Sequence, residues 1–342
     1  MVGPSPKMQG GVASVVNGYI DGGLGRLCNL SYIATACDGP RARKALVFAS
    51  ACLRFYRKVR ATDVVHIHMS MRASFERKYL LARIAKENGK RIVAHVHDGE
   101  FAALYESASD AYRRRVREFF GWVDVVIVLS VEWRNYFSAN VCDAEKIVVM
   151  HNAVALPDVP AEPIAHRNVL FLGRLGANKS PDVLLKAAKA LRARFPEVRY
   201  RFGGDGDVVK YRVLAEELGV ADVCDFVGWV TGEEKECLVR ESGVFCLPSR
   251  HEGMPMSMLE MMAYGLPCVM TPVGGIPQVI RNGVNGYTFP VCDAGALASL
   301  LEGLFNSRGL RCKIGNAARK TIAEEFNIHT NIKKLEELYA KL

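Results

Sequence analysis

The chain has 342 residues, of which 50% are hydrophobic and 24% are charged. This length exceeds what one hydrophobic core usually serves, and the composition excludes a disordered or fibrous protein. The longest smoothly apolar run near the N-terminus, 45–53, is far shorter than the roughly 20 residues of a membrane-spanning helix. The totals therefore predict a globular protein of two domains that does not cross a bilayer.

The net charge of +9 is concentrated in the first half, where residues 1–160 carry 22 Lys+Arg against 15 Asp+Glu. Such an excess favours an anionic partner, namely lipid head groups, a phosphorylated substrate or nucleic acid, or else it only solubilises the surface. No nucleic-acid-binding module is recognisable, so we expect no nucleic-acid partner. The ten cysteines lack C-x-x-C spacing, and we expect reduced, mostly buried thiols in a cytoplasmic protein.

The first half of the chain alternates short apolar runs with helical patterns. It opens on a short apolar stub and Gly10-Gly11, followed by a helix-like pattern, which is typical of a βα unit with a short first strand. Further strands are predicted at 63–68, 91–97, 124–130 and 146–151. Strands that alternate with helices in this way predict a parallel sheet covered on both faces.

The pattern is interrupted around residues 155–168, where Pro157, Pro160 and Pro163 predict a linker. The alternation then resumes, with strands predicted at 168–173, 198–204, 221–228, 243–249 and 267–271. We therefore predict an α/β fold of two doubly wound, Rossmann-like domains in tandem. Ligands are expected at the carboxyl ends of the strands.

The first motif of the second half follows the strand "NVLFLG". Arg174 leaves the end of this strand, Lys179 follows five residues later, and Ser180-Pro181 is typical of a helix start with Ser at the cap. Two cations beside a helix N-terminus suit a diphosphate. The alternative is an ordinary surface arginine and lysine.

The next motif, "RFGGDGD", places Asp205 and Asp207 in D-x-D spacing. These carboxylates could hold a divalent cation on a nucleotide diphosphate, but the glycines and Asp205 suit a tight turn between strand and helix equally well. We favour the turn.

In the first half, "HVHDGEF" places His95 and His97 on one face of a predicted strand. His97 comes at the carboxyl end, where it is a candidate active-site residue, and we expect His95 to be satisfied within the core. A zinc site would need further ligands, which His66 and His68 could supply only if they faced the same way.

The segment "PSRHEGMPMSMLEMMAYGLPCV" carries two glutamates eight residues apart. Glu252 is predicted on a loop at the end of a buried strand, and Glu260 about one turn inside a short helix stopped by Gly265. Two carboxylates beside free helix amides can bind hydroxyls and an anion of one ligand. The alternative is a capping carboxylate and a solvated helix glutamate.

Together these motifs closely resemble the retaining nucleotide-sugar glycosyltransferases of family four. The matching run is GRL-x₃-K, GGDG, then R-x-EG-x-P-x₄-E and "TPVGGIPQVIRNGVNGYTF" (271–289), with "GGV", "HVHDGEF" and "MHNAV" matching in the first half. The resemblance implies the GT-B architecture of two facing Rossmann-like domains. It implies an acceptor-side domain at 1–157, a nucleotide-sugar domain at 158–328, and a last helix at 329–342 that packs back on the first domain.

The resemblance also implies a role for each candidate residue. The donor would be a nucleotide diphosphate sugar, with a UDP-sugar first and GDP-mannose next. Glu260 would bind the ribose hydroxyls, and Arg174 and Lys179 the diphosphate. Gly11 would approach the diphosphate from the first domain, and His97 would lie near the anomeric carbon. The sugar would be held by Glu252 and the segment of Gly253, Met254, Pro255, Met256 and Ser257.

The family needs no metal or other cofactor, and none is expected here. Two positions depart from the family pattern: Ser180 stands where glycine is usual, and Gln278 where glutamate is frequent. Both leave the spacing of Arg174 and Lys179 unchanged. They leave donor specificity open.

The acceptor implied by the resemblance is a saccharide or lipid-linked saccharide of bacterial cell-surface polysaccharide or glycolipid synthesis. Segments 41–60 and 112–122 mix arginines with apolar residues, which suits docking on an anionic membrane, or else they are helices with apolar sides in the core. Two other functions fit the same architecture: a nucleotide-sugar 2-epimerase and a non-catalytic nucleotide-sugar-binding scaffold. The sequence does not determine the oligomeric state.

Overall fold

The computed structural model describes residues 1–158 and 166–342. Two compact units are present: unit 1 comprises Met1–Ala153 and Ile328–Leu342, and unit 2 comprises Val154–Asn327. The sequence analysis placed the divisions after residues 157 and 328. Pro160 and Pro163 of the predicted linker lie outside the described residues.

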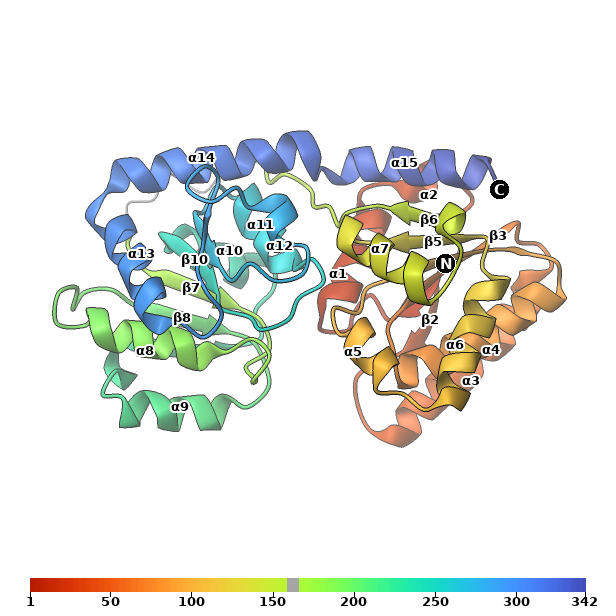
Figure 1. The fold of residues 1–342 in the computed structure, drawn as a ribbon, viewed down its shortest axis with the longest axis horizontal. Helices are drawn as coiled ribbons and strands as arrows, with labels where there is room; N and C mark the ends of the chain where they lie inside the picture. Colours follow the sequence, from red (N-terminus) through yellow and green to blue (C-terminus); the bar gives the residue numbers. More distant parts are fainter. Residues whose placement is uncertain (159–165) are drawn as a thin grey trace. The chain divides into compact units, whose positions relative to one another are not determined.

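Unit 1 is built on a six-stranded parallel sheet with helices on both sides (Figure 1). The strand order is β2-β1-β3-β4-β5-β6. Its strands are β1 (Val2–Pro4), β2 (Ile33–Ala36), β3 (Val64–Met69), β4 (Arg91–Val96), β5 (Val125–Val128) and β6 (Ile147–Val149). Its helices are α1 (Gly11–Asp21), α2 (Leu24–Leu27), α3 (Arg41–Val59), α4 (Ala73–Glu87), α5 (Phe101–Glu106), α6 (Asp110–Trp122), α7 (Val131–Asn140) and α15 (Ile328–Ala340).

Unit 2 repeats this plan with strand order β12-β11-β10-β7-β8-β9. Its strands are β7 (Val169–Leu172), β8 (Tyr200–Gly203), β9 (Cys224–Gly228), β10 (Val244–Leu247), β11 (Cys268–Met270) and β12 (Tyr287–Thr288). Its helices are α8 (Pro181–Leu191), α9 (Val208–Glu217), α10 (Gly232–Arg240), α11 (Met256–Ala263), α12 (Ile276–Val279), α13 (Ala294–Asn306) and α14 (Arg308–Glu325). Two parallel sheets flanked by helices confirm the predicted α/β fold.

The two strands β2 and β12 were not predicted. β2 has the sequence IATA, and β12 is only two residues long. Both lie at a sheet edge and pair with one neighbour, β1 or β11. β2 has one large apolar residue, Ile33, and neither residue of β12 is fully buried, so no hydrophobic period marks these strands in the sequence.

The last helix, α15, belongs to unit 1, where it packs against α1 and α2. Ile328, Ile332 and Leu335 form its buried side. A side chain at Gly22 would meet the Cδ1 atom of Ile332 at 2.6 Å, so α15 packs closely against the end of α1 at this glycine. The C-terminal residues therefore complete the core of the first unit.

The cysteines form no disulfide among the described residues, and all ten are free thiols. The expectation that most are buried is wrong, because only Cys224, Cys246 and Cys268 are buried. Burial raises the pKa of each of these three thiols. None of the helices in the described ranges combines the length and the apolar character that a membrane span requires.

Candidate active site

The loop between β7 and α8 carries the first two candidate residues. Arg174 is exposed and makes no ion pair with another described residue. α8 begins at Pro181 as predicted, but Ser180 does not cap it. The Ser180 hydroxyl instead donates to the Ala177 carbonyl (3.0 Å) and accepts from Arg250 Nε (3.1 Å).

Ser180 has left-handed backbone angles, with φ of 46°. This is a conformation that glycine adopts at little cost and other residues adopt rarely. The structure therefore gives a physical reason for glycine being the usual residue of the family here. In this chain the two hydrogen bonds of the serine hydroxyl offset part of the backbone strain.

Lys179 and Glu252 form an ion pair, which the sequence analysis did not predict. The Lys179 ammonium donates to Glu252 Oε1, and the Ser249 hydroxyl donates to the same oxygen at 2.6 Å. Only 7% of the Glu252 side chain is exposed. A nearly buried carboxylate needs such partners, because its desolvation is otherwise costly. The pair joins the two motifs that the resemblance links to the diphosphate and the sugar.

The loop around Glu252 is held by backbone contacts with its neighbours. The Gly275 amide donates to the Gly253 carbonyl at 2.6 Å, and a side chain at Gly274 would meet the Glu252 carbonyl oxygen at 1.9 Å. The Arg250 amide donates to the Asn178 carbonyl at 2.7 Å. The glycines of "TPVGGIP" thus let a second loop pack directly against the glutamate loop.

Glu260 lies on α11, where its Oε2 atom accepts from Lys235 Nζ of α10 at 3.1 Å. Both side chains are about one quarter exposed, at 24% and 27%. α11 begins without a side-chain cap and ends as predicted before Gly265, which has a φ of 80°. Met256 and Ser257 belong to its first turn, where helix amides attract negative charge.

The "GGDG" turn after β8 packs on the loop after β7. A side chain at Gly204 would meet the Gly173 carbonyl oxygen at 1.9 Å, and one at Gly206 would meet the Leu175 carbonyl oxygen at 2.3 Å. The backbone groups of Asp205 and Asp207 bond to Leu175 at 2.7 and 2.8 Å. These contacts account for the glycines by packing, which supports the turn interpretation of this motif.

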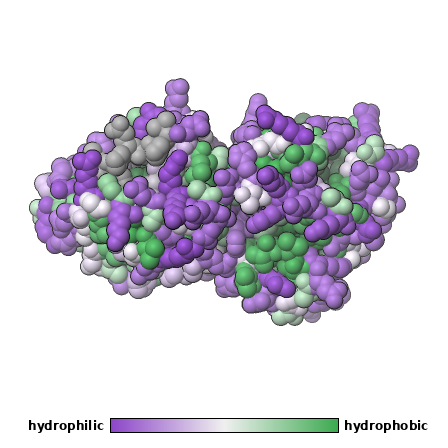
Figure 2. Space-filling view, turned by 90° about the horizontal axis from the view of Figure 1, so that it is seen from above, coloured by the Kyte–Doolittle hydropathy of each residue, from purple (hydrophilic) through white to green (hydrophobic). Residues whose placement is uncertain are grey.

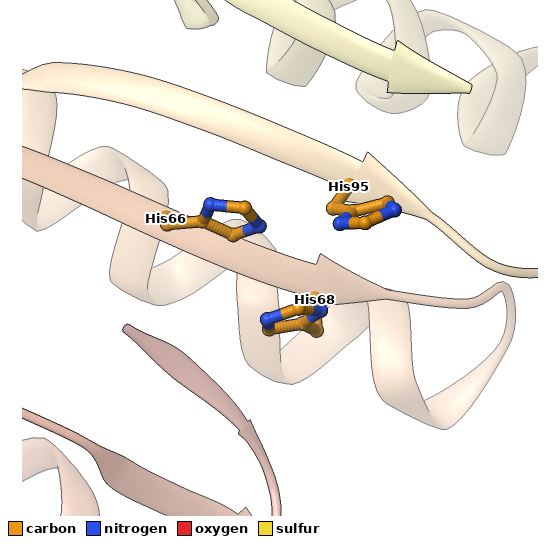
Figure 3. A group of neighbouring side chains, drawn as sticks. All are labelled: His66, His68 and His95. Atoms are coloured by element: carbon orange, nitrogen blue, oxygen red, sulfur yellow. The ribbon is translucent and has the colours of Figure 1, made fainter. Parts of the chain in front are cut away.

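In unit 1, His66, His68 and His95 lie side by side on β3 and β4 (Figure 3). His66 Nδ1 is 2.6 Å from the Tyr339 hydroxyl oxygen, and His68 Nδ1 is 2.9 Å from His97 Nε2. Both ring nitrogens of His95 are buried without a hydrogen-bond partner among the described residues, so its expected satisfaction within the core is wrong.

The three buried imidazoles are neutral. Burial holds the pKa of His66, His68 and His95 well below the ordinary 6.5, and neighbouring histidines lower it further. The condition for a zinc site is met in part, because the three residues face the same way with ligand atoms within 4.8 Å of one another. The rings of His66 and His68 are stacked, however, with centroids 4.6 Å apart, and coordination of one ion would need ring rotation.

His97 follows β4 at the carboxyl end of the sheet, as predicted. Its ring stacks on that of His68 with centroids 5.2 Å apart, and burial of the ring lowers its pKa to about 3. The next residue, Asp98, accepts from the amides of Met71 (2.9 Å) and Glu100 (3.0 Å). The aspartate of "HVHDGEF" therefore fixes the loop that carries His97.

Gly11 is the first residue of α1 and lines a pocket of about 220 Å³ in unit 1. Gly10, with a φ of 130°, has no side chain to cap this helix. The pocket also contains Arg77 and Lys78 of α4. Neither residue was predicted as a site residue, because both lie inside a regular helical pattern.

The family model for Glycosyltransferase Family 4 matches residues 28–156, and that for Glycosyl transferases group 1 matches residues 159–321. Together they span most of both units. The chain belongs to glycosyltransferase family four.

Relatives and solved structures agree with this membership. The amylovoran biosynthesis glycosyltransferase AmsK of Erwinia amylovora is 27% identical over 88% of this chain and 75% of its own length. The D-inositol 3-phosphate glycosyltransferase of Streptomyces scabiei is 31% identical over 58% of this chain, and the match spans about half of that enzyme, 49%.

Two solved structures share the fold at low identity. The crystal structure of Anabaena HepE in complex with UDP-glucose has a TM-score of 0.78 at 17% identity and covers 100% of this chain and 98% of HepE. Sucrose-phosphate synthase from Thermosynechococcus elongatus has a TM-score of 0.76 at 18% identity, with coverage of 99% and 97%. These glycosyltransferase structures confirm the GT-B architecture of this chain.

Proposed function

We propose that this glycosyltransferase is retaining and transfers a hexose from a nucleotide diphosphate sugar, with a UDP-sugar as the first candidate. The observation that carries the proposal is the contact in unit 2 between Lys179, which lies just before α8, and Glu252, which lies on the loop that leads into α11. It places a cation, a carboxylate and helix amides in one unit. HepE, which shares the fold, binds UDP-glucose.

The pair supplies both kinds of group that such a donor needs. When the donor binds, Lys179 would turn to the diphosphate, and Glu252 would accept from sugar hydroxyls. Arg174, which is exposed and forms no ion pair with another described residue, would add a second cation. Cleavage of the donor builds negative charge on the departing diphosphate, and preorganised cations and amides stabilise that charge.

The other donor contacts follow the family resemblance. Glu260 would bind the ribose hydroxyls and in doing so exchange its contact with Lys235. In unit 1, Gly11 would contact the diphosphate and His97 the sugar. We favour attack on the face of the departing diphosphate, with that phosphate accepting the acceptor's proton. The reaction would need no metal, because Arg174 and Lys179 supply the countercharge.

The test is transfer from a panel of UDP-, GDP- and ADP-sugars to saccharide acceptors, with release of the nucleoside diphosphate as the readout. We expect one UDP-hexose to be used, a product with the anomeric configuration of the donor by NMR, and the same rate in excess EDTA. An inverted product would refute retention. A rate abolished by EDTA and restored by a divalent cation would refute metal independence.

We further propose that the acceptor is a saccharide or lipid-linked saccharide of an exopolysaccharide or glycolipid, as the name of AmsK supports. The enzyme would work in the cytoplasm at the inner face of the membrane. Hydrophobic residues reach the surface in patches among hydrophilic ones (Figure 2). On α3, Leu46, Leu53 and Tyr56 are 72%, 53% and 57% exposed.

The charge of segment 41–60, which contains α3, supports membrane docking. The packing of segment 112–122, which lies in α6, does not. The segment 41–60 contains seven arginines and lysines and no acidic residue. In α6, by contrast, Phe119 and Phe120 are buried in the core of unit 1, so its aromatic side is not available to a membrane. Docking is therefore assigned to α3 alone.

Liposome flotation tests this assignment. We expect the wild type to float with anionic vesicles at low salt and not at high salt, and Leu46→Ser/Leu53→Ser to float less. The matched control is Val209→Ser, which changes an exposed apolar residue of α9 in unit 2 (77% exposed). Equal flotation of all three proteins, or none by the wild type, would contradict docking through α3.

A further inference from the structure

A second charged site lies in unit 1, in the pocket beside the N-terminus of α1. Its polar lining includes Gln9 and Gly11 beside the helix start, His68 and Ser70 near the end of β3, and Ser74, Arg77 and Lys78 on α4. None of the residues that line this pocket is acidic. Asp38 is close, but its carboxylate accepts from the Gln9 amide at 3.3 Å.

Lys78 is the residue that most needs explanation. It is only 1% exposed, and its ammonium donates to the Thr35 hydroxyl. That hydroxyl in turn donates to the Gly3 carbonyl at 2.8 Å. No carboxylate of the described residues pairs with Lys78, and burial lowers its pKa to about 7. A buried cation without a counter-ion destabilises a fold unless something binds it.

The rest of the pocket also offers polar groups without hydrogen-bond partners among the described residues. Arg77 Nε and His68 Nε2 are buried and have no hydrogen-bond partner among the described residues. α1 has eleven residues, and no side chain caps its first-turn amides. Two cations, free helix amides and two serine hydroxyls around one pocket are the donor set that binds an oxyanion.

We propose that this pocket binds a phosphate or carboxylate group of a substrate, with Lys78 and Arg77 as its counter-ions. The proposal rests on the proposed transferase function for the identity of that substrate. Two sources share the chemistry: the diphosphate of the donor, and an anionic group on the acceptor. In unit 1 only Gly11 is proposed to contact the donor diphosphate, and unit 2 has its own cation for it, Lys179. Lys78 and Arg77 therefore favour an anionic group on the acceptor as the source.

Sulfate is a suitable probe because it keeps its charge across the working pH range. Calorimetric titration of the full-length chain with sulfate, at constant ionic strength, should show saturable binding. In Lys78→Met the affinity should fall at least about ten-fold. Lys86→Met, a change of an exposed lysine on the same helix, should bind as the wild type does. A second titration in saturating UDP identifies the source, because displacement assigns the pocket to the donor and unchanged binding assigns it to the acceptor.

A stability measurement separates this role from a structural one. Methionine fills the place of the lysine stem without a charge, so Lys78→Met should unfold at the same urea concentration as the wild type or a higher one. Absence of sulfate binding in the wild type, equal binding in Lys78→Met, or a clear loss of stability in that variant would overturn the proposal. None of these readouts requires glycosyl transfer, so a failure of the transferase assignment would be seen separately.

Discussion

Single residues of unit 2 have distinguishable parts in the proposed donor site. Lys179 is paired with a nearly buried carboxylate, whereas Arg174 is exposed and free of ion pairs among the described residues. The two cations are assigned the same task in the reaction. They should differ in what their removal does to the fold.

Replacement of either cation by alanine should lower kcat/KM by about 10²–10³-fold, the effect of losing one preorganised electrostatic group. Arg174→Ala should leave the free energy of unfolding within about 0.5 kcal/mol of the wild type. Lys179→Ala should lower it by about 1–3 kcal/mol, because Glu252 loses a partner while buried. Steady-state kinetics and urea unfolding measure both quantities.

Lys186→Ala is the matched control, because this exposed lysine pairs with Asp182 on the surface of α8. It should change neither activity nor stability appreciably. Wild-type turnover in Arg174→Ala or Lys179→Ala would remove that residue from the leaving-group site.

The backbone of Ser180 gives a prediction about strain. Ser180→Gly and Ser180→Ala both remove the hydroxyl and its bonds to Ala177 and Arg250. At ordinary positions glycine is less stable than alanine by roughly 0.5–1 kcal/mol. Here the left-handed φ reverses the order, and the glycine variant should be more stable by about 1 kcal/mol. Urea unfolding of the two variants measures this difference. A more stable alanine variant would contradict the left-handed backbone angles of Ser180.

At the scale of the element, the histidines on one face of β3 and β4 make the stability of unit 1 depend on pH. In the unfolded chain these imidazoles titrate near 6.5, whereas in the fold burial lowers their pKa values. Below that pH the unfolded state binds more protons than the native state. The stability contribution is therefore complete above about pH 7 and is lost as the pH falls.

The free energy of unfolding should thus decrease below about pH 6.5, by up to about 1.4 kcal/mol per pH unit for each histidine that stays neutral. His95→Leu removes one such site from a residue without hydrogen-bond partners, so its pH dependence should be shallower. His166→Gln, a change of an exposed histidine, should leave the slope unchanged. Urea unfolding between pH 5 and 8 in the presence of a chelator tests this, and identical slopes for all three proteins would contradict it.

Elements with a clear hydrophobic period were predicted correctly from the sequence. The apolar strands β3, β4 and β10, and the helix starting at Pro181, lie where their patterns placed them. The strands β2 and β12 were not predicted, because too few of their residues are large and apolar to leave a hydrophobic period. The histidines of β3 and β4 were placed on strands, but their mutual packing depends on parallel register, which pairs His68 with His95.

At the scale of the whole molecule, two parallel sheets and family membership followed from the order of strands, helices and motifs. The residues of the candidate site were predicted only in part, and their contacts were not. Lys179 and Glu252 are 73 positions apart, and their contact arises because β7 and β10 are neighbours in the sheet. Lys235 and Lys78 were missed for a related reason: a single lysine on a helix has no sequence signal until tertiary packing gives it a partner or buries it.

The central claim is that unit 2 binds a nucleotide diphosphate sugar through Glu260 and its neighbours. The most direct measurement is a thermal-shift panel of UDP, GDP, ADP and their sugar conjugates on the wild type, Glu260→Ala and the surface control Glu216→Ala, since a ligand that binds only the native state raises its stability. We predict a rise in Tm with UDP and one UDP-sugar, retained in Glu216→Ala and lost in Glu260→Ala. No shift with any nucleotide, or an equal shift in Glu260→Ala, would contradict the account.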